Sequence, residues 1–397
     1  MSILDKLSQR DIWESFYRYK VSLAGSKSFC RELRSFIDNE MYIPVCKKIR
    51  SGDQFPFPEK SVISKLDSKK KRIVYTYPEA ENMVMKLLTY LLLREYDSLF
   101  SDGLYSFRPK KTAKDAIRRL TCVPNIGEMF SYKADISNYF NSVPLEKLLP
   151  MLKKATEEDS ELYEFLESLL KEPHVIDRGN IITEEKGIMA GTPLSAFLAN
   201  LYLRELDWAF YDKGIIYGRY SDDIILFAES LELCEKYADF LRSFIADYGL
   251  TINPSKESFY KPQDEWVFLG FSYKDGIIDI APASVEKLKN KMRRKARALQ
   301  RWKKRNEING ENAALAFIRI FNSKLFEYSD SNDLTWSKWF FSVINTDESL
   351  KIIDHYAQEC VRFLISGKRT KSRFNVRYND IQRLGLRSLV HEYYKYG

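Results

Sequence analysis

Histidine and closely spaced cysteine are the scarcest reactive features of this 397-residue chain. Its histidines, His174, His355 and His391, are scattered, which gives little support to a histidine-based nuclease or metallohydrolase site. The five cysteines lie far apart and none forms a C-x-x-C pair. We therefore expect reduced thiols, and neither a disulfide framework nor a zinc site.

The chain also lacks long apolar segments. No apolar run approaches the ~20 residues that a membrane span needs, and the N-terminus lacks the basic and apolar regions of a signal peptide. We expect a soluble, cytoplasmic protein with no membrane partner.

What the chain has in quantity is apolar and basic residues. Hydrophobic residues make up 45% of it and aromatic residues 14%, enough for two or three domains with substantial cores. Lys and Arg number 63 against 55 Asp and Glu, a net charge of +8. This excess suits a polyanionic partner such as nucleic acid, although many basic proteins bind none.

Hydrophobic periodicity predicts mixed secondary structure. Two β-prone runs around the charged tip 67–71 predict a hairpin, and residues 79–100 predict a helix. Further segments follow the same rules. Strands are expected at 129–134, 215–220, 224–228 and within 265–279, and helices at 4–50, 143–154, 195–208, 231–248 and 287–305. A change to basic, helical sequence places a domain boundary near Ala283.

Two short segments carry carboxylates at the ends of apolar strands. Asp135 ends the run from Tyr132, and Asp222 and Asp223 occupy the turn between two further strands. Clustered carboxylates repel one another unless a cation neutralises them, and Mg²⁺ prefers such oxygen ligands. Two-metal phosphoryl transfer needs carboxylates from separate strands, with ions about 3.5–4 Å apart. An Asp-Asp pair alone is common in surface turns, so this prediction depends on Asp135, which lies on a separate strand.

These segments stand in the order and spacing of the palm motifs of reverse transcriptases, which the chain resembles from about residue 60 to 275. The resemblance rests on six elements. They are the Lys65–Arg72 hairpin with Tyr105-Ser106-Phe107-Arg108-Pro109, Asp135 with Phe140, Gly187–Asn200, Tyr220-Ser221-Asp222-Asp223, Gly249-Leu250-Thr251-Ile252-Asn253-Pro254-Ser255-Lys256 and Val267-Phe268-Leu269-Gly270-Phe271.

The resemblance implies an α+β, right-hand polymerase fold. N-terminal helices and fingers would occupy 1–128, an antiparallel palm 129–283 with a fingers insertion at about 145–186, and a helical thumb with a C-terminal extension 284–397. Asp135, Asp222 and Asp223 would be both the catalytic and the metal-binding residues, holding two Mg²⁺ ions, with Mn²⁺ a possible substitute. The expected activity is RNA-directed DNA synthesis from deoxynucleoside triphosphates.

Five further residues are expected to contact the nucleotide. Phe140 stands at the position of the family's steric gate against a ribose 2′-hydroxyl, or is a core residue at a strand end. Lys65 and Arg72 would grip the triphosphate, or belong to a solvated turn. Gly191 would allow close backbone approach. Lys256 would neutralise or protonate pyrophosphate, or be a surface lysine.

Within the bacterial members, the resemblance is to the group II intron and retron-like lineage. Met189-Ala190-Gly191 replaces the Pro-Gln-Gly of group II intron enzymes, and the Val-Thr-Gly element of retrons is missing. The run from Gly191 to Asn200 is more similar to the defence-associated enzymes, the unknown-group and abortive-infection reverse transcriptases. This similarity implies a role in anti-phage defence.

Two basic segments are expected to contact nucleic acid. The first, within 287–305, includes Arg293, Arg294 and Arg297, and could track a duplex backbone or be a solvated helix face. The second comprises Lys368, Arg369, Lys371 and Arg373. The expected partners are a structured non-coding RNA as template, the DNA product and deoxynucleotides. A template-independent nucleotidyl transferase and a maturase-like RNA-binding protein remain alternatives, and the oligomeric state is open.

Overall fold

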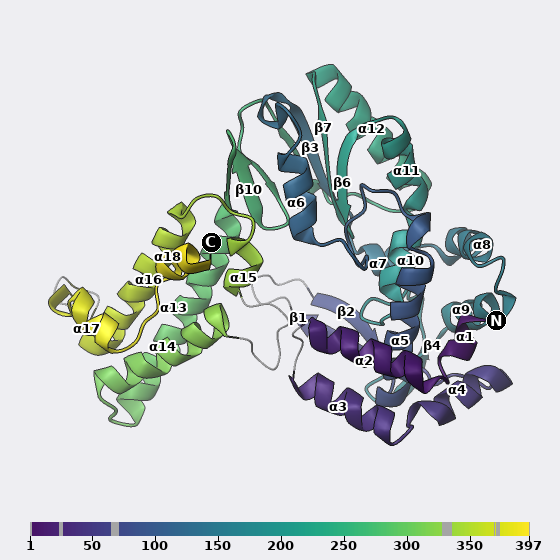
Figure 1. Ribbon diagram of the computed structural model, residues 1–397, viewed down its shortest axis with the longest axis horizontal. Helices are drawn as coiled ribbons and strands as arrows, with labels where there is room; N and C mark the ends of the chain where they lie inside the picture. The colour runs from purple at the N-terminus through teal and green to yellow at the C-terminus, as the bar shows by residue number, and fades with distance from the viewer. Residues whose placement is uncertain are drawn as a thin grey trace. The chain divides into compact units, whose positions relative to one another are not determined.

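A computed structural model describes residues 2–23, 27–64, 71–327, 336–368, 370 and 374–396 (Figure 1). The chain forms two compact units. The first comprises residues 1–22 and 29–262, and the second comprises residues 23–28 and 263–397. Both units combine helices with antiparallel strands, so the predicted α+β class is confirmed.

Two sheets organise the first unit. The palm sheet has the order β6-β7-β3-β8 and is antiparallel throughout. Its strands are β3 (Phe130–Asp135), β6 (Ile216–Tyr220), β7 (Asp223–Ala228) and β8 (Ser258–Tyr260). The second sheet has the order β2-β1-β4-β5. It consists of β1 (Glu59–Ser64), β2 (Lys71–Thr76), β4 (His174–Asp177) and β5 (Asn180–Thr183).

The second sheet contains the predicted hairpin as β1 and β2. Segment 145–186, expected as a fingers insertion within the palm, contributes β4, which pairs with β1 in parallel through Glu59 and Ile176. No pattern in the sequence indicated this pairing, because the two strands are more than a hundred residues apart.

Helices surround these sheets. Their bounds are α1 (Ile3–Lys6), α2 (Arg10–Ser22), α3 (Lys27–Asp38), α4 (Tyr42–Ser51), α5 (Glu79–Glu95), α6 (Ala113–Thr121), α7 (Tyr139–Ser142), α8 (Leu145–Ala155), α9 (Ser160–Lys171), α10 (Ser195–Tyr202), α11 (Arg204–Asp212) and α12 (Leu231–Asp247). Three short 3₁₀ turns, at Asp97–Leu99, Ile126–Glu128 and Pro254–Lys256, complete the described part of this unit. The helix expected over 195–208 is divided at Leu203, where φ is −102° and ψ is 16°.

Helix α12 shows how local sequence builds the palm. Ser230 caps its start by accepting a hydrogen bond from Leu233 N at 3.2 Å. Its buried residues recur at helical spacing on one face: Cys234, Ala238, Leu241 and Ile245. This face packs on β3 and β7, while α6 and α11 pack on β6 (Figure 1). The central strand β7 is therefore apolar and buried along nearly its whole length.

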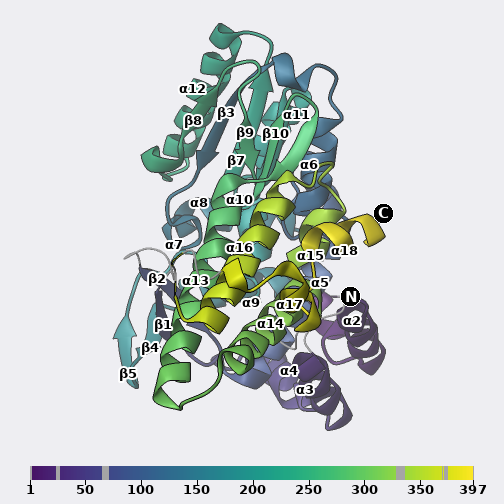
Figure 2. The same ribbon diagram turned by 90° about the vertical axis from the view of Figure 1, so that its left-hand side faces the viewer.

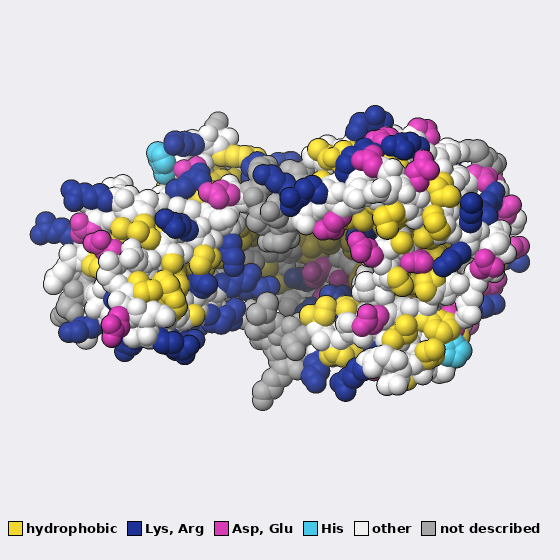
Figure 3. All heavy atoms as spheres, turned by 90° about the horizontal axis from the view of Figure 1, so that it is seen from below, with side chains coloured by type: hydrophobic (Ala, Val, Ile, Leu, Met, Phe, Trp, Pro, Cys, Tyr) yellow, Lys and Arg dark blue, Asp and Glu magenta, His cyan; other side chains and the backbone are white. Residues whose placement is uncertain are grey.

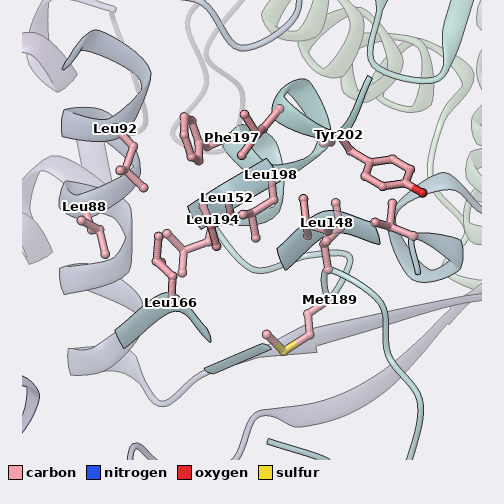
Figure 4. Close-up of a cluster of buried hydrophobic side chains, with 14 of the residues drawn as sticks. Leu88, Leu92, Leu148, Leu152, Leu166, Met189, Leu194, Phe197, Leu198 and Tyr202 are labelled. Carbon is pink, nitrogen blue, oxygen red and sulfur yellow. The ribbon is translucent and has the colours of Figure 1, made fainter. Parts of the chain in front are cut away.

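The core of the first unit joins helices from distant parts of the chain. Figure 4 shows apolar side chains of α5, α8, α9 and α10 converging on one another. They include Leu88, Leu92, Leu148, Leu152, Leu166, Phe197 and Leu198, each at most 1% exposed. This continuous core supports the palm sheet and the loop that carries Met189.

The second unit begins with a three-stranded antiparallel sheet of order β11-β10-β9, formed by β9 (Trp266–Phe268), β10 (Phe271–Lys274) and β11 (Ile277–Ile280). Its helices are α13 (Pro282–Arg305), α14 (Gly310–Phe326), α15 (Trp336–Phe341), α16 (Glu348–Ser366), α17 (Tyr378–Arg383) and α18 (Leu389–Tyr396). Helices α13, α14 and α16 pack together, as Figure 2 shows.

The expected domain divisions can be located relative to the two compact units. The boundary placed near Ala283 lies inside the second unit. Among the described strands, β9, β10 and β11 pair only with one another, and α16 packs on β11. The division expected between residues 128 and 129 lies inside the first unit, because α5 and α10 share one core. No described helix has the length and apolar character needed to cross a bilayer.

Candidate active site

Two central strands of the palm sheet bring three carboxylates to the same edge. Asp135 ends β3, and its register partner on β7 is Asp223. The backbone N–H of Ile136 donates to Asp222 O at 3.0 Å, so the turn that carries Asp222 is joined directly to β3. The strand register thus brings these three residues to one edge of the palm sheet, whose strands β3, β7 and β6 lie side by side in Figure 1.

The turn between β6 and β7 has an unusual backbone. Tyr220 pairs with Asp223, leaving Ser221 and Asp222 as the connecting residues. Ser221 has φ +61°, a conformation that a two-residue hairpin loop favours but that glycine adopts more readily than serine. Such a conformation persists where surrounding contacts determine it. Those contacts come from Arg219, whose Nη1 donates to Ser221 O at 3.2 Å.

Asp222 and Asp223 occupy an environment that disfavours their negative charge. Burial raises the pKa of Asp222, and the charge of Asp135 raises it further. Burial also raises the pKa of Asp223, with Lys133 opposing the effect and the other two carboxylates adding to it. A group of acids in this state gains from a nearby cation.

Lysine side chains supply part of that positive charge. The ammonium of Lys256 contacts Asp135, and that of Lys133 lies 3.9 Å from Asp223 Oδ1. Burial alone would lower the pKa of Lys256, but the hydrogen bond to Asp135 and the neighbouring carboxylates raise it overall. Lys256 was predicted to lie at the site, and the structure places it there.

The donor set fits a hard divalent cation. All three side chains are carboxylates on adjacent strand ends, and oxygen ligands are those that Mg²⁺ takes. Within the described ranges no three acidic, histidine or cysteine side chains are gathered closely enough to hold a metal ion. To bind a cation, these carboxylates would have to come closer together and give up the contact of Asp135 with Lys256 and that of Asp223 with Lys133.

Phe140 follows the carboxylate strand within α7. Its ring is partly buried, and its centroid lies 5.6 Å from that of Tyr139. Its carbonyl accepts a hydrogen bond from Ile188 N at 2.9 Å. Gly187 lies against the same backbone, because a Cβ added there would be 2.6 Å from Phe140 O. Phe140 and the loop leading to Gly191 are thus held together.

A clamp fixes the loop that contains Ala190 and Gly191. Asn141 Oδ1 accepts from Ala190 N at 2.9 Å, and its Nδ2 donates to Ile73 O on β2 at 3.2 Å. Tyr75 N donates to Ala190 O at 2.8 Å. Ala190 is only 3% exposed, so its methyl group lies in the packed interior of this joint. Gly191 itself is exposed, with φ +100°.

The predicted fingers residues are placed in part. Arg72 is exposed on β2, opposite Ile63 of β1, and its positive charge lowers the pKa of Asp222 against the larger effect of burial. Lys65 lies outside the described residues.

The residues predicted to contact nucleic acid lie in the second unit. Arg293, Arg294 and Arg297 are exposed on α13, whose buried residues from Val285 to Gln300 occupy another face. Figure 3 shows many Lys and Arg side chains on the surface of this unit. Lys368 is exposed after α16. Arg369, Lys371 and Arg373 lie outside the described residues.

Sequence reasoning missed several residues around the carboxylates. Lys133 is a half-buried residue between buried neighbours on β3, and Asn141 lies within α7, but neither belongs to a motif on its own. Arg219 directly precedes Tyr220 within an apolar strand, where a fully buried charge needs a partner. An arginine inside an apolar strand was therefore the one feature of the sequence that could have indicated this contact.

Comparisons with known proteins agree with this geometry. A family described as "Reverse transcriptase (RNA-dependent DNA polymerase)" matches residues 59–273, more than half of the chain. Retron Ec86 reverse transcriptase of Escherichia coli is 29% identical over 146 residues, which cover 36% of this chain and 42% of that protein. Group II intron-encoded protein LtrA of Lactococcus lactis subsp. cremoris is 23% identical over 204 residues, covering 51% and 34%. The matches thus span less than half of these relatives.

Among solved structures, apo telomerase from Candida tropicalis aligns with a TM-score of 0.48 and 11% identity. The alignment covers 88% of this chain and 73% of that one.

Proposed function

Because the chain belongs to the reverse transcriptase family, we propose that it is an RNA-directed DNA polymerase that copies an RNA into DNA. The observation that carries this proposal is the convergence of Asp135 at the end of β3, Asp223 at the start of β7 and Asp222 in the turn that precedes it. All three lie inside the segment that matches the family.

The proposed chemistry is nucleotidyl transfer. Asp135, Asp222 and Asp223 would hold two Mg²⁺ ions, or Mn²⁺ in their place. When bound, these ions would activate a 3′-hydroxyl for in-line attack on the α-phosphate and neutralise charge on the triphosphate. The bond to the α-phosphate forms as the bond to the leaving pyrophosphate breaks. Lys256 would neutralise or protonate that pyrophosphate, and its contact with Asp135 supports this role.

The surrounding residues would bind and select the nucleotide. Arg72, whose positive charge lowers the pKa of Asp222 against the larger effect of burial, would bind the triphosphate. Phe140 would exclude a ribose 2′-hydroxyl by its ring, and Gly191 would let the backbone approach the nucleotide. Ala190 cannot supply the hydrogen bonds of the glutamine that group II intron enzymes carry here, so fidelity or base preference should differ from theirs.

We further infer that the template is a structured non-coding RNA and that the enzyme acts in anti-phage defence. The exposed arginines of α13 and the basic segment beginning at Lys368 support RNA binding. The similarity of the Gly191–Asn200 run to defence-associated enzymes supports the biological role. This second step rests on resemblance and is the finer part of the proposal.

The test is to purify the protein with the RNA that accompanies it, add Mg²⁺ and labelled deoxynucleotides, and sequence the product. DNA complementary to the co-purified RNA is expected. The variant with Asp222→Ala and Asp223→Ala should make none. Asp212→Ala, which removes an exposed carboxylate at the end of α11, is the matched control and should retain synthesis.

Other outcomes would replace the proposal. Nucleotide addition that ignores the RNA sequence would indicate a template-independent transferase. Retained RNA with no incorporation of any nucleotide would indicate an RNA-binding protein of the maturase kind.

A further inference from the structure

A fully buried ion pair lies directly beneath the carboxylate turn. Arg219 on β6 and Asp207 on α11 both have side chains that are 0% exposed. Arg219 Nε donates to Asp207 Oδ1 at 2.7 Å, and Nη2 donates to Oδ2 at 2.5 Å. The guanidinium and the carboxylate thus form a bidentate ion pair, which is among the strongest hydrogen-bonded pairs in proteins. The pair joins α11 to β6, which pack side by side (Figure 1).

The remaining donors of Arg219 reach the backbone of neighbouring segments. Nη1 donates to Ser221 O at 3.2 Å, and Nη2 also reaches Asn200 O at 3.4 Å. Ser221 is the residue with φ +61° that precedes Asp222. The guanidinium is therefore bonded to the turn on one side and to the helical layer of α10 and α11 on the other.

The backbone of Arg219 is anchored as well. Its N–H donates to Gly103 O at 2.9 Å, and its carbonyl accepts from Tyr105 N at 2.9 Å. The side chain thus projects from a strand position that is held on both sides. Its geometry relative to Ser221 is set by the fold.

Stability alone does not account for this pair. Removing two charges from water is costly, and replacing a buried ion pair with apolar residues of similar volume often leaves stability unchanged or improves it. An apolar pair, however, has no donor for the Ser221 carbonyl. What the charged pair adds at this place is a directed hydrogen bond to the turn.

We propose that Asp207 and Arg219 are positioning residues that hold the Ser221 carbonyl and so fix the backbone turn from which Asp222 and Asp223 bind a divalent cation. Asp207 orients the guanidinium, and the guanidinium orients the turn. This inference rests on the proposed function in that it takes the carboxylates as the metal ligands.

The test measures Mn²⁺ binding directly, by the loss of the electron paramagnetic resonance signal of free Mn²⁺ during titration. Binding that disappears in the Asp222→Ala, Asp223→Ala variant defines the site. Arg219→Lys keeps a positive charge for Asp207 but has a single ammonium in place of the fork. It should weaken Mn²⁺ binding about 10–100-fold, the usual loss when the residues supporting metal ligands are changed.

Tyr217→Phe is the matched control. Tyr217 Oη donates to the same Asp207 Oδ1 at 2.8 Å, from the same strand, and its hydroxyl is bonded to Asp207 and not to the turn. This variant should lower the thermal unfolding midpoint while leaving Mn²⁺ affinity unchanged. The contrast separates loss of a buried hydrogen bond from loss of the turn's support.

A second variant covers the case in which Arg219→Lys does not fold. Asp207→Leu combined with Arg219→Met removes both charges and fills the space with apolar atoms. It should fold and should also lose Mn²⁺ affinity. Mn²⁺ binding equal to that of the unsubstituted protein, in either folded variant, overturns the inference.

Deoxynucleotide incorporation is measured on the same preparations. No incorporation by the unsubstituted protein, with Mn²⁺ binding that still depends on Arg219, refutes the proposed function and leaves the positioning role supported. If the unsubstituted protein shows no Mn²⁺ binding that depends on Asp222 and Asp223, the positioning role is refuted.

Discussion

Gly191 offers the sharpest test of how the nucleotide loop is built. The residue has φ +100°, and a Cβ added there would lie 3.0 Å from Tyr75 O and 3.0 Å from Val74 Cβ. Both atoms belong to β2, which is paired along its length with β1. Tyr75 N also donates to Ala190 O, so β2 cannot move away without breaking this joint. Gly191→Ala should therefore strain the backbone and the packing together.

The cost of backbone strain and the cost of overpacking can be separated by comparing Gly191 with a second glycine. A non-glycine residue in a sparsely populated backbone conformation costs about 1–3 kcal/mol. Forcing an extra carbon into a packed contact costs about 1–3 kcal/mol more. Gly179, in the turn between β4 and β5, has φ +83° but nothing within 4 Å of an added Cβ. Gly179→Ala should thus incur the first cost alone.

The measurement is the midpoint temperature of the earliest thermal transition in which the first unit unfolds. Since 1 kcal/mol shifts this midpoint by about 2–4 °C in domains of 150–250 residues, Gly191→Ala should lie at least about 2 °C below Gly179→Ala. It should also raise the KM for deoxynucleotides, because β2 carries Arg72. Equal midpoints for the two variants would refute the argument that β2 presses on this loop.

The site and the second unit support three further predictions. Burial raises the pKa of Asp223 in the folded protein. The stability that its protonation confers is therefore complete below about pH 3.9 and is lost as the pH rises through the folded-state pKa. Asp223→Asn should raise the unfolding midpoint at pH 7, and the difference from the unsubstituted protein should disappear near pH 4. Phe140→Ala should admit ribonucleotides, measured as the ratio of ribonucleotide to deoxynucleotide incorporation, and an unchanged ratio would contradict its role as a gate. Charge reversal at Arg293 and Arg297 should reduce the slope of the logarithm of the RNA-binding constant against the logarithm of salt concentration. The expected reduction is about 0.7–0.9 for each phosphate that the protein no longer neutralises. The control is Arg178→Glu, at a side chain of the first unit that is 94% exposed, which should leave the slope unchanged.

Much of the palm was predictable because its signals are local. Apolar runs bounded by turn residues identified β3, β6 and β7, and the order of side chains along them put Asp135, Asp222 and Asp223 at strand ends. The stripe of apolar residues on α5 predicted the helix, and its members from Val84 to Leu92 are buried in the core. Each of these patterns involves residues a few positions apart, which share one helix face or one strand.

The sequence by itself thus determined which residues carry the carboxylates and which segments become strands. The tertiary structure alone decided how those carboxylates are supported. Arg219 meets Asp207 only because α11 packs on β6, and Asn141 meets Ala190 and Ile73 only because three distant segments converge. The division between units likewise depends on which strands find partners. Such contacts join residues of different elements, from 12 to 68 positions apart, so no periodicity within one helix or strand records them.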